Sequence, residues 1–196
     1  MMSLPFSLKY SAGPLFIALC SVVAFFFEPM SGNYLAYDRY AIQGLETWRI
    51  VSGNIVHTNG YHLLLNLAGL ALLWALHGEH YRIGLYLRVF VWCCLGTSVG
   101  LYFFSPDLIW YAGLSGALHG IFAWGACVDI KEKMKSGWLL LIGLAIKVGY
   151  EQIDGSSEQV ANLIDAKVAV DAHLFGALTG IAIFLLMFIT AKKNTN

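Results

Sequence analysis

The chain has 196 residues, of which 58% are hydrophobic and 12% are charged, and its formal net charge is zero. A soluble domain of this size usually carries about 25% charged residues. This composition and a mean hydropathy of +0.66 therefore exclude an ordinary soluble domain and indicate a polytopic protein embedded in the lipid bilayer, and the neutral charge balance gives no indication of a nucleic-acid partner.

Six apolar segments predict six transmembrane helices within a single membrane domain that covers residues 1–196. In chain order they are residues 12–27, 57–77, 83–104, 113–129, 137–150 and 170–190. No small-residue cleavage site follows the first segment, so we interpret it as a retained span rather than a signal peptide. The fourth has 17 residues and would reach only about 25 Å, less than the hydrocarbon core of about 30 Å. We expect it to tilt, to thin the bilayer or to border a water-filled cavity.

The distribution of charges predicts the orientation of these spans. One set of termini and loops holds most of the basic residues, namely Lys9, Arg82, Lys131, Lys133, Lys135, Lys192 and Lys193. The opposite set holds nine of the twelve acidic residues, namely Glu28, Asp38, Glu46, Asp107, Glu151, Asp154, Glu158, Asp165 and Asp171. By the positive-inside rule both termini are cytoplasmic, and the second, fourth and sixth spans run inward from the outer side.

Two connections are long. The segment from Glu28 to Val56 is rich in aromatic residues, so we expect it to lie at the membrane interface. The segment 151–170, "EQIDGSSEQVANLIDAKVAV", is polar. We expect it to be a flexible connection on the outer side, where a lid over the membrane-embedded residues would lie.

Polar side chains from three distant spans are predicted to share one depth in the outer half of the membrane. They are His57, His62 and Asn66 in the second span, Ser115 and His119 in the fourth, and His173 in the sixth. Ionisable residues inside a membrane are costly, and they are by default candidates for a functional site.

The second span begins with "HTNGYHLLLN", in which His62 and Asn66 lie four residues apart and share a helix face. Both side chains can donate hydrogen bonds, and donors aimed at a tetrahedral oxyanion contribute on the order of 3 kcal/mol each. A pair of interhelical polar contacts is the alternative interpretation. His57 lies on a different face at the start of the helix, so we assign it a structural or gating role.

The fourth span begins with "GLSG", in which Gly113 and Gly116 flank Ser115. Glycine permits a tight entry into the helix, and the free N–H groups of a helix N-terminus favour developing negative charge. A serine at this position is well placed to attack a carbonyl group, although small residues at this spacing are also common packing residues. His119 lies one turn deeper, and we expect it to support His173 by stacking or hydrogen bonding; a role as the primary base or in packing alone stays open.

The sixth span contains "AHLFGALTG", which places Ala172, Gly176 and Gly180 on one face. The fourth span offers Gly116 and Gly120 at the same spacing. Two faces of small residues allow helices to approach closely, which would bring His173 within hydrogen-bonding reach of Ser115, where a base must take the hydroxyl proton. Alternatively, His173 binds a carbonyl group and only fastens the two helices.

The remaining candidates receive structural interpretations. Asp171 is two residues from His173, which is poor geometry for orienting it, and we expect a solvated acid. His77 and His80 are expected to be solvated residues of the cytoplasmic turn. The four cysteines, Cys20, Cys93, Cys94 and Cys127, lie in apolar runs without metal-ligand spacing, and we expect buried small hydrophobic residues.

In order along the chain, "WR" at 48–49, "HTNGYHLLLN", "GLSG" and "AHLFGALTG" resemble the motifs of the rhomboid family of intramembrane serine proteases. The resemblance implies a compact six-helix bundle, with Ser115 as nucleophile and His173 as base in a dyad that lacks an essential aspartate. It implies an oxyanion site formed by His62, Asn66 and the Ser115 N–H, and no metal or cofactor. It also implies that the loop 28–56 lies half in the membrane and that the fifth span and the loop after it gate access.

At the position of His119, many rhomboids have a tyrosine that packs on the catalytic histidine. The form "GLSGALHG" on a minimal six-span chain is similar to the bacterial rhombosortase branch. That resemblance implies an enzyme of the bacterial inner membrane, opening to the periplasm, that processes membrane-anchored proteins ending in a Gly-Gly motif, a transmembrane helix and a basic tail.

Three other readings stay open. The chain could be a general rhomboid protease acting on other single-span substrates, or a catalytically inactive rhomboid-like protein that binds helices. In the third, a metal ion is bound by four histidines, His57, His62, His119 and His173. The sequence indicates neither the oligomeric state nor whether water or another nucleophile completes the reaction.

Overall fold

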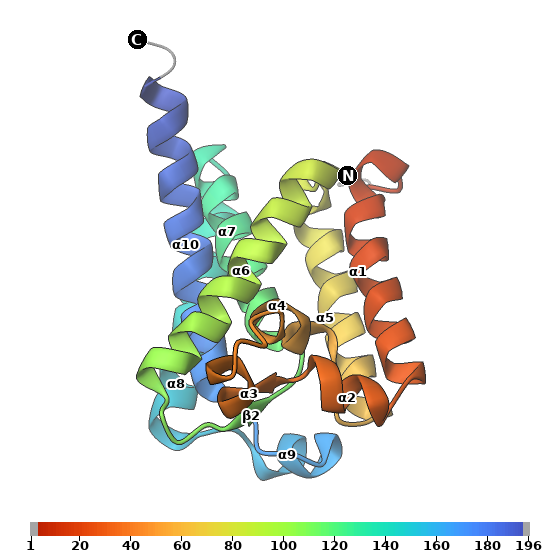
Figure 1. Ribbon diagram of the computed structural model, residues 1–196. Helices are drawn as coiled ribbons and strands as arrows, with labels where there is room; N and C mark the ends of the chain where they lie inside the picture. The colour runs from red at the N-terminus through yellow and green to blue at the C-terminus, as the bar shows by residue number, and fades with distance from the viewer. Residues whose placement is uncertain (1–3, 194–196) are drawn as a thin grey trace.

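The computed structural model of the chain describes residues 4–193 and shows an all-α membrane protein (Figure 1). Each of the six predicted apolar segments forms a long helix with ends within a few residues of the prediction. These helices are α1 (Leu8–Phe26), α5 (Gly60–His77), α6 (Ile83–Phe104), α7 (Ser115–Lys131), α8 (Lys135–Asp154) and α10 (Val170–Lys193).

Four segments of the described chain are long and apolar enough to cross a membrane. They are Leu8–Phe26, Gly60–His80, Ile83–Phe104 and Val170–Thr190. The helix α7 is shorter, at 17 residues, and α8 carries Lys147 and Glu151 within its last two turns. The six-span topology and the cytoplasmic position of the termini therefore stay predictions.

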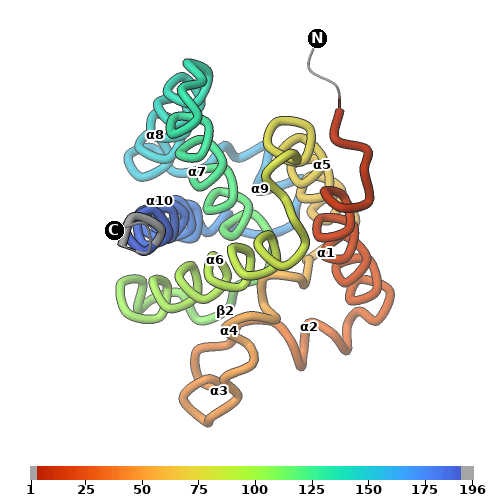
Figure 2. The backbone as a smooth tube through the Cα atoms, turned by 90° about the horizontal axis from the view of Figure 1, so that it is seen from above, coloured from red at the N-terminus to blue at the C-terminus, as the bar shows by residue number. Residues whose placement is uncertain are grey.

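Helix α7 lies in the middle of the bundle, where it contacts α5, α6, α8 and α10 (Figure 2). Eleven of its 17 residues are buried. A helix buried on most of its circumference needs small or apolar residues on nearly every face, which explains the run of glycine and alanine along "SGALHGIFAWGA". The helix that begins with Ser115 is thus the most enclosed of the six.

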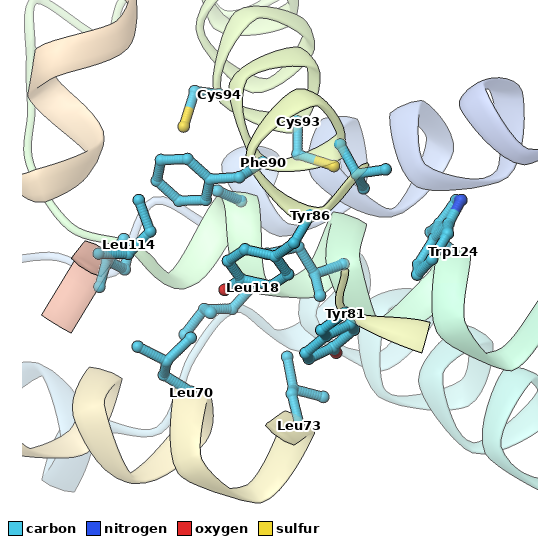
Figure 3. Close-up of a cluster of buried hydrophobic side chains, with 14 of the residues drawn as sticks. Leu70, Leu73, Tyr81, Tyr86, Phe90, Cys93, Cys94, Leu114, Leu118 and Trp124 are labelled. Carbon is cyan, nitrogen blue, oxygen red and sulfur yellow. The ribbon is translucent and has the colours of Figure 1, made fainter. Parts of the chain in front are cut away.

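The largest hydrophobic cluster draws most of its members from α5, α6 and α7 (Figure 3). Its aromatic members Tyr81, Tyr86 and Trp124 pack together, with ring centroids of Tyr81 and Tyr86 4.7 Å apart and of Tyr81 and Trp124 6.4 Å apart. Cys93 and Cys94 are fully buried within the same cluster and Cys127 is also buried, as predicted, whereas Cys20 is only partly buried. This cluster holds α7 against its neighbours and so fixes the position of Ser115 relative to α5 and α6.

The predicted close packing of the fourth and sixth spans is confirmed. A methyl group added at Gly176 would overlap the carbonyl oxygen of Gly116, and one added at Gly180 would overlap the carbonyl oxygen of Gly120. Backbone therefore lies against backbone along two turns of α7 and α10, and no larger residue fits at these positions without separating the helices.

The long connection between α1 and α5 is largely structured. It contains α2 (Met30–Leu35), β1 (Tyr37–Asp38), α3 (Arg39–Gln43), α4 (Arg49–Ser52) and the 3-10 helix η1 (Gly53–Ile55). Strand β1 pairs in antiparallel fashion with β2 (Trp110–Tyr111) in the connection that leads into α7. Arg39 is buried and donates to four backbone carbonyl groups between residues 101 and 108, which ties this segment to the end of α6.

The connection 151–170 also contains more regular structure than predicted. Helix α8 continues to Asp154, and α9 (Glu158–Ile164) follows it, capped at its start by the side chain of Ser157. Two side chains next to the start of α5 hold the end of α9. Thr58 Oγ1 donates to the carbonyl oxygen of Ile164 (2.5 Å) and Asn59 Nδ2 to that of Leu163 (3.0 Å).

The prediction that His77 and His80 are solvated is wrong. His77 is buried, and both histidines approach the buried carboxylate of Asp129 on α7, with Nε2 to oxygen distances of 3.4 Å and 3.1 Å. The fold brings the turn after α5 against the C-terminal end of α7 and gives these imidazoles a buried partner in place of water.

Candidate active site

A glycine turn places Ser115 at the first residue of α7. Gly113 has a φ of +126°, a conformation that residues with side chains rarely adopt, and a Cβ atom there would lie 2.6 Å from His62 Nε2. The Gly113 N–H donates to the carbonyl oxygen of Gly53, and the Gly113 carbonyl accepts from the Tyr111 hydroxyl (2.6 Å). This anchored turn places the N-terminal N–H groups of α7, which have no partner within the helix, beside Ser115.

The structure brings Ser115 and His173 together from positions 58 residues apart in the chain. The Ser115 Oγ and His173 Nε2 atoms lie 3.0 Å apart, within hydrogen-bonding distance. His173 is in the first turn of α10 and is 5% exposed. The contact follows from the packing of α7 on α10, because the backbone at Ala172 lies directly against Gly116.

Glu151 is a member of the cluster that sequence reasoning missed. Its Oε2 atom lies 2.8 Å from His173 Nδ1, and its Oε1 atom lies 2.7 Å from Lys147 Nζ. The charge pattern of the sequence predicts only that Glu151 is one of the acidic residues of the outer loops. The available signal was the i,i+4 pairing of Lys147 and Glu151 at the end of an apolar run, since ionisable residues in such a helix indicate a functional site.

His119 lies flat against His173, with ring centroids 4.0 Å apart and planes inclined by 12°. Its Nδ1 atom is 2.7 Å from the Ser115 carbonyl oxygen. A carbonyl oxygen only accepts hydrogen bonds, so Nδ1 carries the proton. The ring therefore supports His173 by stacking, and its hydrogen bond goes to the backbone of Ser115 rather than to the hydroxyl group.

His62 and Asn66 face the turn at Gly113 from α5. Both side chains are buried, and a Cβ atom at Gly113 would lie 2.6 Å from His62 Nε2 and 3.7 Å from Asn66 Nδ2. The His62 Nδ1 atom is 3.0 Å from Thr58 Oγ1, and Asn66 Nδ2 donates to the carbonyl oxygen of His62 (3.1 Å). Two potential donors are thus held next to the N-terminus of α7.

His57 packs against His62 and forms no hydrogen bond with Ser115 in the part of the chain that the structure describes. The two rings meet edge to face with centroids 5.0 Å apart, and His57 is 1% exposed. His57 therefore supports the ring of His62 by packing against it.

Asp171 does not orient His173. Its carboxylate accepts a hydrogen bond from Ser105 Oγ (2.5 Å), and the residue is half-buried. The prediction that Asp171 is a solvated acid is therefore wrong. Asp171 instead links the start of α10 to the end of α6.

Two cavities meet at Ser115. One, of about 640 Å³, is lined by Thr58, the connection 104–112 and residues 164–171. The other, of about 550 Å³, is lined by apolar residues of α5, by Leu118, His119 and Phe122 of α7, and by Leu144, Lys147, Tyr150 and Glu151 of α8. Ser115 and His62 border both cavities.

The structure does not gather the four histidines that the alternative metal site would require. His57 and His62 contact each other, while His119 and His173 lie with Glu151, and the ligand atoms of these three residues lie within 4.8 Å of one another. An imidazole binds a metal ion in the plane of its ring. Because the rings of His119 and His173 are nearly parallel and stacked, their planes do not converge on a common ion.

A family model described as "Rhomboid domain" matches residues 44–190. The matched range contains every predicted site residue, together with Glu151 and the elements from α4 to most of α10. Comparison with curated proteins gives no significant match.

Proposed function

The chain belongs to the rhomboid family, a family of intramembrane serine proteases, and we propose that it is itself a serine endopeptidase that cleaves other proteins next to their membrane anchor. The observation that carries the proposal is the 3.0 Å contact between Ser115 Oγ and His173 Nε2 at the N-terminus of a buried helix. A serine needs an adjacent base to become a nucleophile, and His173 has the position of that base.

The reaction proceeds through an acyl-enzyme. Ser115 Oγ forms a bond to the scissile carbonyl carbon while His173 Nε2 takes the hydroxyl proton. His173 returns this proton to the leaving amine as the C–N bond breaks. Water, or another nucleophile such as an amine, then attacks the acyl group on Ser115. Its proton passes through His173 back to Ser115 Oγ, which releases a carboxylic acid or a new amide.

During the reaction a negative charge develops on the carbonyl oxygen of the substrate, and hydrogen-bond donors of α5 and α7 would stabilise it. His62, Asn66 and the Ser115 N–H are the groups proposed for this task. Preorganised donors of this kind stabilise a transition state far more than donors in water, because they need no reorganisation during the reaction. The burial of His62 and Asn66 supports this assignment.

The proposed substrate is that of the rhombosortase branch: a surface-destined protein with a Gly-Gly motif, a transmembrane helix and a basic tail. The support is the sequence "GLSGALHG" and the histidine at position 119. A peptide bond inside a helix has its carbonyl oxygen in a hydrogen bond, so the cleaved segment must be extended. Glycine disfavours helix by about 1 kcal/mol per residue relative to alanine, and a Gly-Gly pair therefore keeps the segment open to attack.

The proposed setting is the bacterial inner membrane, with six spans, cytoplasmic termini and an active site opening to the periplasm. The charge distribution along the chain supports this orientation. The cavity bounded by residues 104–112 and 164–171 would then supply water, and the apolar cavity between α5 and α8 would face the lipid-embedded substrate.

The test uses the full chain reconstituted with a single-span substrate that carries the Gly-Gly tail. Wild type should cleave it and react with a fluorophosphonate at Ser115, while Ser115→Ala and His173→Ala should do neither. Cleavage by Ser115→Ala would overturn the mechanism. Equal cleavage of a substrate with Leu-Leu in place of Gly-Gly would indicate a general rhomboid protease, and binding without cleavage or labelling would indicate an inactive helix-binding protein.

A further inference from the structure

The geometry points to a third member of the active site: we propose that Glu151 is a positioning residue that holds His173 in the orientation and tautomer needed to activate Ser115. The inference rests on the proposed function and departs from the two-residue dyad that the family resemblance implies. It assigns to α8 a part in the chemistry as well as in enclosing the cavity.

The hydrogen bonds of His173 define its tautomer. Its Nδ1 atom faces the Glu151 carboxylate at 2.8 Å, and its Nε2 atom faces Ser115 Oγ at 3.0 Å. An ionised carboxylate only accepts hydrogen bonds, so Nδ1 carries the proton and Nε2 is left with the lone pair that accepts the hydroxyl proton. Glu151 therefore favours the one neutral form of His173 that works as a base.

The same carboxylate lies next to the charge that forms during the reaction. When His173 takes the Ser115 proton it becomes an imidazolium ion, and a negative group 2.8 Å from Nδ1 stabilises that ion. This interaction is stronger in the transition state than in the resting enzyme, and interactions of that kind accelerate the chemical step.

Glu151 is itself fixed by a second contact. Lys147, one turn earlier on α8, donates to Oε1 at 2.7 Å, so each carboxylate oxygen has a separate partner. The Glu151 side chain is 13% exposed and that of Lys147 49% exposed. The ammonium group neutralises a carboxylate that burial would otherwise disfavour.

Helix α8 packs against the other helices along a narrow face. Because it carries Glu151, its position decides whether His173 has a carboxylate partner. Only three of its residues, Gly137, Leu144 and Val148, are buried. Leu144 and Val148 pack against Ala123 of α7 and Ala177 of α10. Because α8 also borders the apolar cavity, a displacement of its outer end would remove Glu151 from His173, and the completed triad requires α8 to be packed in place.

The test compares Glu151→Gln and Glu151→Asp with wild type. Glu151→Gln should lower kcat and the rate of fluorophosphonate labelling at Ser115 by up to about 10⁴-fold, the loss seen when the carboxylate of a serine protease triad is replaced by its amide. KM should be almost unchanged, and Glu151→Asp should recover part of the rate. Asp154→Asn removes an exposed carboxylate from the same helix and should behave as wild type.

Thermal unfolding of each variant separates positioning from stability. Wild-type kcat and labelling in a folded Glu151→Gln protein would overturn the inference and leave Glu151 as a structural ion pair. If wild type itself neither cleaves nor is labelled, the proposed function fails. The inference is then decided by ¹⁵N NMR of the histidine side chains, with His173→Asn for assignment. The Nδ1–H tautomer of His173 should dominate in wild type and be lost in Glu151→Gln, and an unchanged tautomer would contradict the inference.

Discussion

The imidazole ring of His119 is stacked on that of His173, with centroids 4.0 Å apart and an angle of 12° between the planes. The hydrogen bond from His119 Nδ1 to the Ser115 carbonyl oxygen ties this stack to the start of α7. His119 thus holds the face of the proposed base from the same helix that carries the proposed nucleophile, which gives the residue two separate tasks.

Substitution of His119 separates those tasks. His119→Tyr should keep the stacking and most of the activity, because the ring found at this position in many rhomboids is a tyrosine. His119→Ala should lower kcat by about 3- to 10-fold, since aromatic pairs contribute about 0.5–1.5 kcal/mol beyond the area they bury. Steady-state cleavage with a Gly-Gly substrate measures both. Loss of all activity in His119→Tyr would instead assign the essential role to the hydrogen bond with Ser115.

The contact between α7 and α10 predicts a strong effect of side-chain size. Gly176→Val should destabilise the protein by about 1–3 kcal/mol or more and should also abolish cleavage, because the added carbons overlap the Gly116 backbone and move His173 away from Ser115. Thermal unfolding and fluorophosphonate labelling measure the two effects. Gly143→Ala, at a position on α8 where no atom outside the helix's own backbone lies within 4 Å of the added methyl group, is the control. It should leave labelling unchanged and should not destabilise the protein, because alanine favours a helix over glycine by about 1 kcal/mol.

The donors on α5 should act on the chemical step. His62→Ala and Asn66→Ala should each lower kcat by about 10²- to 10³-fold with little change in KM, because an oxyanion exists only along the reaction path. Leu64→Ala, on the exposed side of the same helix, controls for general effects on α5. An increase in KM at constant kcat would show that these side chains bind the substrate rather than the transition state.

The helices and the approach of α10 to α7 were predictable because both depend on local patterns. The lengths of the apolar runs define the helices, and glycine at a spacing of four residues allows backbones to meet wherever it occurs in facing helices. The proximity of Ser115 and His173 follows directly from these two patterns, without knowledge of any other contact.

Glu151 and the pair of His77 with Asp129 could not be predicted in the same way. An acidic residue at the end of an apolar run has the composition of a solvated loop, and only the packing of α8 against α10 places Glu151 beside His173. Likewise, Asp129 lies 52 residues after His77, and nothing in either neighbourhood shows that their helices meet. Pairing between distant ionisable residues depends on tertiary geometry, which local hydropathy does not contain.

The position of α8 should control access for large substrates more than for small reagents. The apolar cavity lies between α5 and α8 and is bordered by Leu65 and Tyr150. Cysteines introduced at these two positions and joined by a bifunctional thiol reagent should hold the helices together. Cleavage of a membrane-anchored substrate should then fall at least 10-fold, while fluorophosphonate labelling of Ser115 should continue, because Glu151 stays beside His173 and the small reagent reaches the hydroxyl group through the cavity lined by residues 104–112.

Each single-cysteine variant treated with the same reagent controls for modification alone, and the native cysteines are accounted for by the treated wild type, in which Cys93 and Cys94 are fully buried. Unchanged cleavage in the cross-linked protein would contradict entry between α5 and α8 and would indicate entry through the cavity lined by residues 104–112. Loss of labelling together with cleavage would show that the cross-link distorts the site itself. Loss of cleavage alone would show that α8 must move for a transmembrane substrate to enter and must return for Glu151 to contact His173 again.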